Sequence, residues 1–245
     1  TPRTLTIAGY SGVNKVYDGS TAATVTITGD DRVGGDVLTF NPTATFDTKN
    51  VGDGKTVTIS NVTLSNTDAG NYVLASTTGS TTANITTKSL TIAGISKVYD
   101  GTTNAVLTSG HYTFGGLVAG DAVTLDPTAA GTYTDNKNVG TNKAVSLTGI
   151  ALQGADAGNY TINNTAAGAI GTITPATLVY LADTKTFVSG SPVPALSGNV
   201  TGFVGGETVA SATTGTLAWN TAALQNSPAG SYSINGSGLA ANNDN

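Results

Sequence analysis

The sequence predicts an all-β fold of three tandem repeat domains, small β-sandwich-like or similar β-rich modules that form an extended rod. The first observation is composition. Of the 245 residues, 45 are Thr and 32 are Gly, only 10% are charged, and there is one Glu and no Met. Residues that favour helices are therefore scarce, whereas residues that favour strands and turns are abundant. The other two observations are internal repetition and short apolar segments separated by Gly, Asn and Asp.

Five blocks of the first copy return in the same order in the second copy. The pairs are Leu5–Gly9 with Leu90–Gly94, Lys15–Gly19 with Lys97–Gly101, Gly35–Asp36 with Gly120–Asp121, Lys49–Gly52 with Lys137–Gly140, and Asp68–Tyr72 with Asp156–Tyr160. A third, divergent copy matches Ser96–Tyr99 with Thr184–Phe187, Gly120–Val123 with Gly206–Val209, and Asp156–Ile162 with Pro228–Ile234. We therefore predict three domains: copy one (residues 1–88), copy two (89–176) and copy three (177–245). Copy three shows no equivalent of the last strand, so we expect it to lack its closing strand.

Strands are expected where apolar residues alternate or run together between turn signals. In copy one these segments are Thr4–Ile7, Thr24–Thr28, Lys55–Ile59, Tyr72–Ala75 and Thr82–Thr86. In copy two they are Leu90–Ile92, Ala122–Leu125, Ala144–Leu147, Tyr160–Asn163 and Ala169–Thr174. No amphipathic helix of three turns is predicted. The junctions between copies, residues 87–89 and 174–176, are too short to act as flexible linkers, which favours a stiff array.

The repeated motifs resemble a known family of bacterial repeats. Lys-Val-Tyr-Asp-Gly, Lys-Asn-Val-Gly and Asp-Ala-Gly-Asn-Tyr are similar to the YDG repeat domain of large bacterial surface proteins. Residues 192–239 resemble the related MBG-type repeat. The resemblance covers almost the whole chain and implies a place in filamentous-haemagglutinin-like exoproteins and other adhesins of Gram-negative surfaces. It implies stalks or matrix-facing fibres, as in a biofilm, and no enzymatic role.

Charge and composition exclude several other classes of protein. The formal net charge is −5, and no basic stretch is present to neutralise phosphates, so we expect no nucleic-acid partner. No apolar run approaches the length of a membrane helix, and we expect no membrane insertion. The absence of Cys removes disulfides, thiolate metal sites and Cys nucleophiles. We expect a segment of a longer protein, located outside the bacterial cell or on its surface.

The repeated polar and aromatic residues are interpreted as structural. Asp beside Gly is typical of turns, in which the carboxylate accepts backbone N–H groups, and repeated tyrosines are typical of core or corner positions. The residues assigned to this role are Lys15, Tyr17, Asp18, Gly19, Asp68, Gly70, Tyr72, Lys97, Tyr99, Asp100, Gly101, Asp156, Gly158 and Tyr160.

A few residues also suggest catalytic, metal-binding or crosslinking chemistry. His111 is the only histidine, so a Ser-His-Asp triad would depend on it, and a surface role is favoured. Loop acids such as Asp30, Asp47 and Asp135 suggest calcium, but no calcium-loop spacing is present. A Lys–Asn crosslink at Lys15 or Lys97, with the carboxyl of Asp68 or Asp156 as proton shuttle, is a further alternative. We predict no catalytic residue, no cofactor and no metal, with calcium as the alternative.

The predicted function is that of a structural stalk or adhesion segment of a secreted or surface-anchored bacterial adhesin, without catalysis. The first alternative is a carbohydrate-binding module, in which copy three would bind a polysaccharide or host glycan through Trp219 or Tyr180. Both of these aromatic residues are also compatible with a core role. The second alternative is a filament subunit that associates through an open strand edge, because an unpaired edge is a template for pairing.

Overall fold

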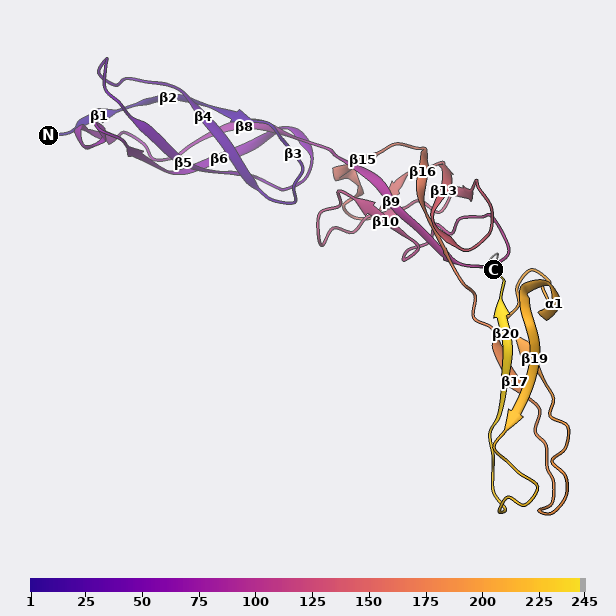
Figure 1. Ribbon diagram of the computed structural model, residues 1–245. Coiled ribbons are helices and arrows are strands. Elements are labelled where there is room, and N and C mark those ends of the chain that lie inside the picture. The colour runs from indigo at the N-terminus through magenta and orange to yellow at the C-terminus, as the bar shows by residue number, and fades with distance from the viewer. Residues whose placement is uncertain (243–245) are drawn as a thin grey trace. The chain divides into compact units, whose positions relative to one another are not determined.

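The computed structural model describes residues 1–242 and shows a protein made almost entirely of β-strands (Figure 1). Strands account for 51% of the residues and helices for 4%. The predicted all-β fold is confirmed. The chain divides into two compact units whose limits differ from those of the repeats. The first unit contains residues 1–91, 114–126 and 150–164, and the second contains residues 92–113, 127–149 and 165 onward.

The first unit contains copy one and one end of copy two. Its strands in copy one are β1 (Arg3–Leu5), β2 (Ile7–Val13), β3 (Lys15–Val16), β4 (Ala22–Asp30), β5 (Thr39–Phe46), β6 (Gly52–Ser65), β7 (Tyr72–Leu74) and β8 (Gly79–Thr86). A six-stranded sheet has the order β2-β4-β5-β6-β8-β3, and β1 pairs with β7 in parallel. Figure 1 shows β1 at one end of copy one and β3 at the other. In β4, for example, exposed and partly buried side chains alternate, as the sequence pattern predicts.

Copy two adds short elements to the first unit. These are β11 (Thr124–Leu125), β14 (Leu152–Gln153), β15 (Tyr160–Ile162) and the start of β9 (Lys88–Val98). β11 pairs with β14, and β15 pairs in parallel with the start of β9. The Asp-Ala-Gly-Asn motif forms a 3-10 turn in both copies, η1 (Ala69–Asn71) and η2 (Ala157–Asn159). Each turn leads directly into the strand that begins with the motif's tyrosine.

The core of the first unit joins side chains from both copies. Buried residues of copy one such as Tyr17, Val57 and Ile59 belong to one hydrophobic cluster with Val123 and Tyr160 of copy two. Burial of apolar area is the main favourable term in folding, so the boundary between copies one and two is part of the core of this unit. A smaller cluster of Leu5, Leu38 and Tyr72 closes the opposite end of copy one.

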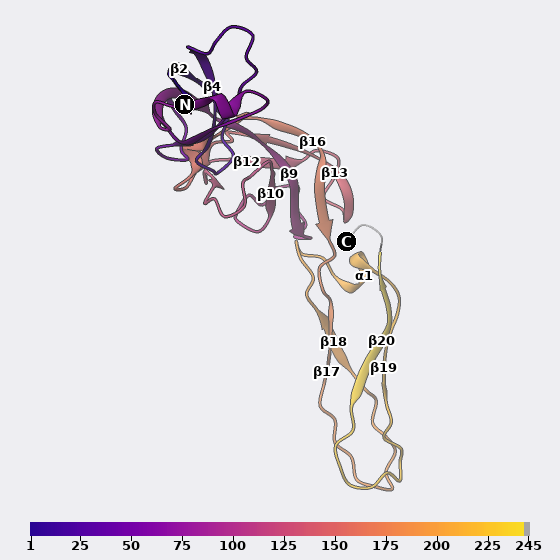
Figure 2. The ribbon, with the colours of Figure 1, turned by 90° about the vertical axis from the view of Figure 1, so that its left-hand side faces the viewer.

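The second unit contains the rest of copy two and the described part of copy three. Copy two supplies the first half of β10 (Tyr112–Gly115), β12 (Ala130–Tyr133), β13 (Gly140–Thr148), β16 (Ala166–Thr174) and the end of β9, in the order β10-β9-β16-β13-β12. Copy three supplies β17 (Val179–Ala182), β18 (Gly198–Thr201), α1 (Val209–Ala212), β19 (Thr213–Thr221) and β20 (Ile234–Ala241). β17 pairs with β18, and β19 pairs with β20, both antiparallel. In Figure 2, α1 lies at one end of the β19–β20 hairpin and the connecting loops lie at the other.

The alignment of Pro228–Ile234 with Asp156–Ile162 is wrong in space. Tyr160 begins β15, which runs parallel to the first strand of copy two. Tyr232, by contrast, precedes β20, which runs antiparallel to β19, as β13 does to β12. The Pro-Ala-Gly segment therefore precedes an antiparallel strand and the Asp-Ala-Gly-Asn segment a parallel one, because a short Ala-Gly-x-Tyr pattern suits more than one turn. The expected absence of a closing strand concerns the chain beyond Asn242, which lies outside the described residues.

Several elements were not predicted. β5, β10 and β12 carry Gly, Pro or scattered polar residues that weaken the alternating pattern. α1 has only four residues and depends on local capping: Thr208 accepts a hydrogen bond from the Ser211 amide, and the Ser211 hydroxyl accepts one from the Thr208 amide. None of the described helices is long and apolar enough to cross a membrane.

Candidate functional site: two polar clasps between repeats

The repeated tyrosines and lysines converge where one repeat meets the next. In the first unit, Tyr17 of copy one is 1% exposed, and its hydroxyl donates to the Asp121 carboxylate of copy two at 2.8 Å. The Lys49 ammonium binds the other oxygen of Asp121 at 3.0 Å and lies 3.5 Å from Asp156. The Tyr160 hydroxyl donates to Asp121 at 2.6 Å. One carboxylate thus accepts hydrogen bonds from two phenols and one ammonium, and its side chain is only 3% exposed. We call Tyr17, Lys49, Asp121 and Tyr160 the first clasp.

Aromatic and backbone contacts surround this carboxylate. The Tyr17 and Tyr160 rings pack edge to face, with centroids 5.3 Å apart, a geometry that suits the ring quadrupoles. The Val51 amide donates to the Asn159 side-chain oxygen at 3.0 Å, and Asn159 is 5% exposed. The Lys-Asn-Val-Gly loop of copy one therefore contacts the Ala-Gly-Asn-Tyr turn of copy two at several points.

Glycine is required in the Tyr-Asp-Gly turn for two reasons. Gly19 has a φ of +80°, in the left-handed region that side chains disfavour. A Cβ at Gly19 would also lie 2.7 Å from the Val118 side chain of copy two. The turn therefore combines a left-handed backbone with close packing against the next repeat. Gly70 and Gly158 differ, because neither has a positive φ and a Cβ at either would meet nothing within 4 Å.

Hydrogen bonding shifts the pKa values within this clasp. Burial alone would raise the pKa of Asp121, but the hydrogen bonds from Tyr160, Lys49 and Tyr17 outweigh burial and hold it below the ordinary value. Burial, followed by the bond to Asp121, raises the pKa of Tyr160 to about 12. The bond to Asp121 also raises the pKa of Lys49. At neutral pH the clasp therefore contains an ionised carboxylate, a charged ammonium and two neutral phenols.

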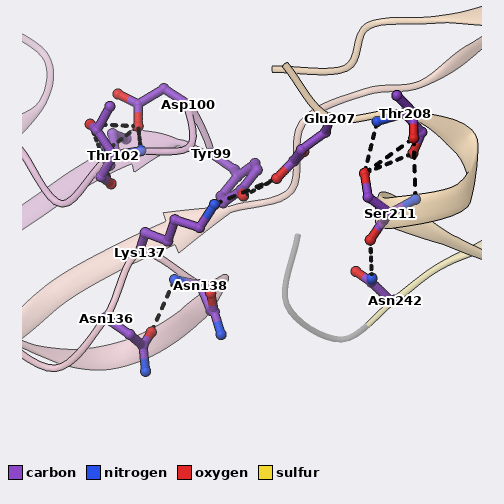
Figure 3. Close-up of polar contacts among 11 residues, drawn as sticks. Tyr99, Asp100, Thr102, Asn136, Lys137, Asn138, Glu207, Thr208, Ser211 and Asn242 are labelled. Carbon is purple, nitrogen blue, oxygen red and sulfur yellow. Dashed lines mark hydrogen bonds and ion pairs between the residues drawn. The ribbon is translucent and has the colours of Figure 1, made fainter. Parts of the chain in front are cut away.

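The second unit contains a matching clasp between copies two and three, shown in Figure 3. The Tyr99 hydroxyl donates to the Glu207 carboxylate at 2.5 Å, and the Lys137 ammonium lies 3.6 Å from the same oxygen. Lys137 also lies over the Tyr99 ring, 5.5 Å from its centroid, much as Lys49 lies over Tyr17 at 5.8 Å. Gly101, with a φ of +75°, approaches the backbone of Gly205. The single Glu of the chain thus occupies the position that Asp121 has in copy two.

The carboxylates of both clasps are presented by the same kind of turn. The Asp121 amide donates to the Val118 carbonyl at 3.2 Å, and the Glu207 amide donates to the Val204 carbonyl at 3.0 Å. The Tyr160 hydroxyl reinforces the first turn by accepting the Val118 amide at 3.0 Å. The side chain of Glu207, one methylene longer than that of Asp121, reaches the Tyr99 hydroxyl from its turn.

The remaining repeated residues shape the turns on either side of each clasp. The Lys97 ammonium, in a side chain that is 2% exposed, binds Asp100 at 2.6 Å and the Thr102 carbonyl at 2.7 Å. Asp100 also accepts the Thr102 amide. Lys15 and Asp18 repeat this arrangement with Ser20. Asp68 and Asp156 bind the backbone amides of Val37 and Ala122, respectively, so neither approaches Lys15 or Lys97 as a proton shuttle for a crosslink would.

Sequence reasoning placed the tyrosines of the clasps among its structural residues but left out their partners. Lys49, Asp121, Asn159, Lys137 and Glu207 were not assigned to any site. Four of them lie in motifs that recur at fixed positions, and Glu207 matches Asp121. The sequence therefore contained an indication of these partners. Three polar motifs repeat together although they are far apart in the sequence, as expected if they meet in space.

Trp219 and Tyr180 pack against each other inside copy three. Their rings are 6.0 Å apart at an angle of 89°, and the Tyr180 hydroxyl accepts the Leu239 amide. Neither lines the cleft of about 650 Å³ at the loop end of copy three, whose walls include Phe187, Pro194 and Tyr232. The role of Trp219 and Tyr180 as ligand contacts stays a prediction that their packing does not favour.

The loop acids and the single histidine have other partners. Asp30 is paired with Arg32, Asp47 with Lys55, and Asp135 with Lys143. Across residues 1–242, no group of three or more His, Asp or Glu side chains is arranged to hold a metal ion. His111 contacts the Thr108 hydroxyl at 3.2 Å.

Comparison with known families agrees with this repeat structure. A family profile described as YDG domain matches residues 1–79 and 81–168, which together span more than half of the chain. The chain belongs to the YDG domain family. A second profile, MBG domain (YGX type), matches residues 178–245, so the divergent copy is an MBG domain that follows two YDG repeats. The predicted resemblance is confirmed. No curated protein and no solved structure matches the chain.

The family assignment also limits the class of function. YDG and MBG domains are not known as enzymes and are typical of extracellular proteins. They indicate a non-catalytic structural or adhesion-related role. The position of the clasps agrees with such a role, because each clasp joins a YDG repeat to the domain that follows it in the chain.

Proposed function

We propose that this chain is a spacer segment of a secreted or surface-anchored bacterial adhesin, in which clasped domain boundaries hold successive domains in a defined orientation. The observation that carries the proposal is the repetition of one arrangement at two boundaries. A Tyr hydroxyl and a Lys ammonium from a YDG repeat meet one carboxylate of the next domain at both places. A stalk needs such boundaries, because a chain of freely pivoting domains does not maintain length.

The physical basis is the difference between a clasp and a flexible linker. A charge-assisted hydrogen bond stabilises by about 1.5–3 kcal/mol, and Asp121 accepts three bonds of this kind in a nearly buried position. Continuous apolar packing adds to these bonds, because Tyr17 and Tyr160 belong to one hydrophobic cluster. The thermal energy RT is about 0.6 kcal/mol, which is small beside the stabilisation by these bonds, so the boundary rarely opens.

The proposal is tested by measuring the distribution of distances across the first clasp. The chain has no Cys, so two introduced cysteines carry the only spin labels. They replace Thr26 and Gln153, two exposed strand residues on opposite sides of the boundary. We expect a narrow distribution in the parent chain and a broad one after Asp121→Asn combined with Lys49→Ala. Asp36→Asn, at the matching position of copy one away from this boundary, is the control and should leave the distribution narrow. A broad distribution in the parent chain would refute the spacer role.

One observation favours glycan binding as a second candidate function. The cleft at the loop end of copy three is lined by two aromatic residues, Phe187 and Tyr232, among aliphatic and hydroxyl-bearing side chains, and Tyr232 is 38% exposed. Aromatic rings beside polar groups suit sugar rings, and ligand sites are commonly concave. Titration of residues 1–245 with polysaccharides and host-type glycans, with and without calcium, tests this candidate. Saturable binding that Tyr232→Ala abolishes would support it. The strand-exchange filament stays a prediction, because it concerns the chain beyond the described residues.

A further inference from the structure

The outer end of copy one carries the same set of residues that copy two uses to receive copy one. Val33, Asp36, Asp68, Asn71 and Tyr72 occupy the positions of Val118, Asp121, Asp156, Asn159 and Tyr160. The Tyr72 hydroxyl accepts the Val33 amide at 2.9 Å and donates to Asp36 at 2.5 Å. The Asp36 amide donates to the Val33 carbonyl at 3.1 Å. We call these five residues of copy one the acceptor face.

The chain also enters both copies in the same way. β1 pairs with β7 in the register Arg3 to Tyr72, Thr4 to Val73 and Leu5 to Leu74. The start of β9 pairs with β15 in the matching register, Lys88 to Tyr160 and onward. A domain joined to Arg3 by a connection as short as the one at Lys88 would therefore contact the acceptor face.

The matching residues of the two copies differ in how far they are covered by other residues. Asn159 is 5% exposed and accepts the Val51 amide, whereas Asn71 is exposed. Val118 is half-buried against Gly19, whereas Val33 is 48% exposed. Within residues 1–242, no Lys or Arg forms an ion pair with Asp36, because the nearby Arg32 is bound to both oxygens of Asp30. The face thus presents a carboxylate and an exposed apolar side chain whose counterparts are covered in copy two.

We propose that the acceptor face binds the Tyr-Asp-Gly and Lys-Asn-Val-Gly loops of a further YDG repeat joined in tandem ahead of copy one. The incoming tyrosine hydroxyl and lysine ammonium bind Asp36, the incoming glycine covers Val33, and the incoming valine amide binds Asn71. This inference rests on the proposed function and names the partner of its next boundary. The partner needs both loops, since the matching carboxylate Asp121 takes one hydrogen bond from each.

The test adds the proposed partner to the complete chain. Residues 1–87 are fused directly to Arg3 of the complete sequence, which reproduces the connection between copies one and two. Val33→Cys then supplies the only thiol, and its rate of reaction with a thiol reagent is measured in the extended and in the original chain. We expect labelling to slow by about tenfold or more, the factor that corresponds to one charge-assisted hydrogen bond. Lys49→Ala in the added repeat should restore the fast rate.

Two further thiols serve as controls. Val73→Cys lies beside the face, and its counterpart Thr161 stays exposed in copy two, so its labelling should be equally fast in both chains. Val118→Cys in the original chain reports the existing clasp and should label slowly. Fast labelling of Val33→Cys in the extended chain beside slow labelling of Val118→Cys would overturn this inference alone. Labelling of Val118→Cys as fast as that of Val73→Cys would overturn the clasp and the proposed function with it.

Discussion

Replacing Asp121 with Asn tests the clasp at the atom on which it depends. The Asp121 side chain is 3% exposed and accepts the Tyr17 hydroxyl at 2.8 Å, the Tyr160 hydroxyl at 2.6 Å and the Lys49 ammonium at 3.0 Å. Asn has nearly the same shape, but it is neutral and keeps only one oxygen acceptor. The amide nitrogen therefore faces either the Lys49 ammonium, which costs one bond, or both tyrosine hydroxyls, which costs two bonds.

The expected loss follows from these bonds. Hydrogen bonds to a charged group stabilise by about 1.5–3 kcal/mol each, which sets an upper range of about 3–6 kcal/mol for two of them. Tyrosine hydroxyls can rotate, and the Lys49 side chain, which is 38% exposed, regains water. We therefore expect the free energy of unfolding of the first unit to fall by about 2–4 kcal/mol.

Urea unfolding of the full chain measures this loss. Near-ultraviolet circular dichroism reports the tyrosines, and fluorescence of Trp219, the only Trp, reports copy three as an internal reference. The matched control is Asp36→Asn. Asp36 accepts a hydrogen bond from the Tyr72 hydroxyl at the corresponding position, but no lysine ammonium pairs with it within residues 1–242. The reasoning is refuted if Asp121→Asn destabilises the chain no more than Asp36→Asn does.

The dependence on pH gives the same variant a second readout. The pKa of Asp121 lies below the ordinary value, so its stabilising contribution is complete above the pKa of an unfolded Asp, about 3.9. The contribution is lost as the pH falls below that value through the folded pKa. The difference in stability between the parent chain and Asp121→Asn should therefore shrink between about pH 5 and pH 2. A difference that stayed constant over this interval would exclude a role for the carboxylate charge.

Three further predictions follow from the same contacts. Gly19→Ala should destabilise the first unit by about 1–3 kcal/mol in urea unfolding, because it adds a side chain at positive φ against Val118; Gly70→Ala is the control and should be close to neutral. Absorbance titration should reveal a tyrosine with a pKa of about 12, Tyr160, whose contribution to stability is complete below about pH 10 and is lost as the pH rises through 12; the Tyr160→Phe variant must lack that transition. Lys97→Met should cost about 1–3 kcal/mol in thermal or urea unfolding, because the Asp100 carboxylate and the Thr102 carbonyl lose the ammonium that donates to both; unchanged stability would contradict that assignment.

The local physics of the chain was largely predictable. Alternating apolar residues marked ten strand segments, and each overlaps an observed strand. Asp followed by Gly marked the Tyr-Asp-Gly turns, and the structure gives Gly19 and Gly101 the left-handed φ that glycine adopts readily. These features depend on residues close together in the sequence, so composition and spacing carry them. β5 was missed because Asn41 and Pro42 interrupt its alternation and its pairing with β6 compensates.

The function class was also predictable, because it depends on repetition rather than on a site. The tandem motifs alone identify the YDG and MBG domains. The internal match of copy three is the weaker prediction, because it aligns Pro228–Ile234 with Asp156–Ile162. Short motifs of Gly, Ala and Tyr fit several turns, and only strand direction distinguishes them.

The sequence by itself determined that this chain is a β-rich array of two YDG repeats and one MBG domain, with turns and strands set by local patterns. Only the tertiary structure decided what the repeated polar residues do. Tyr17, Lys49 and Asp121 are separated by 32 and 72 residues along the chain, and they belong to two different repeats. A repeat unit analysed alone shows its tyrosine and its lysine without their carboxylate, because the partner is supplied by the next domain. The clasp exists only once the strands of both copies have paired and brought three distant motifs to one boundary.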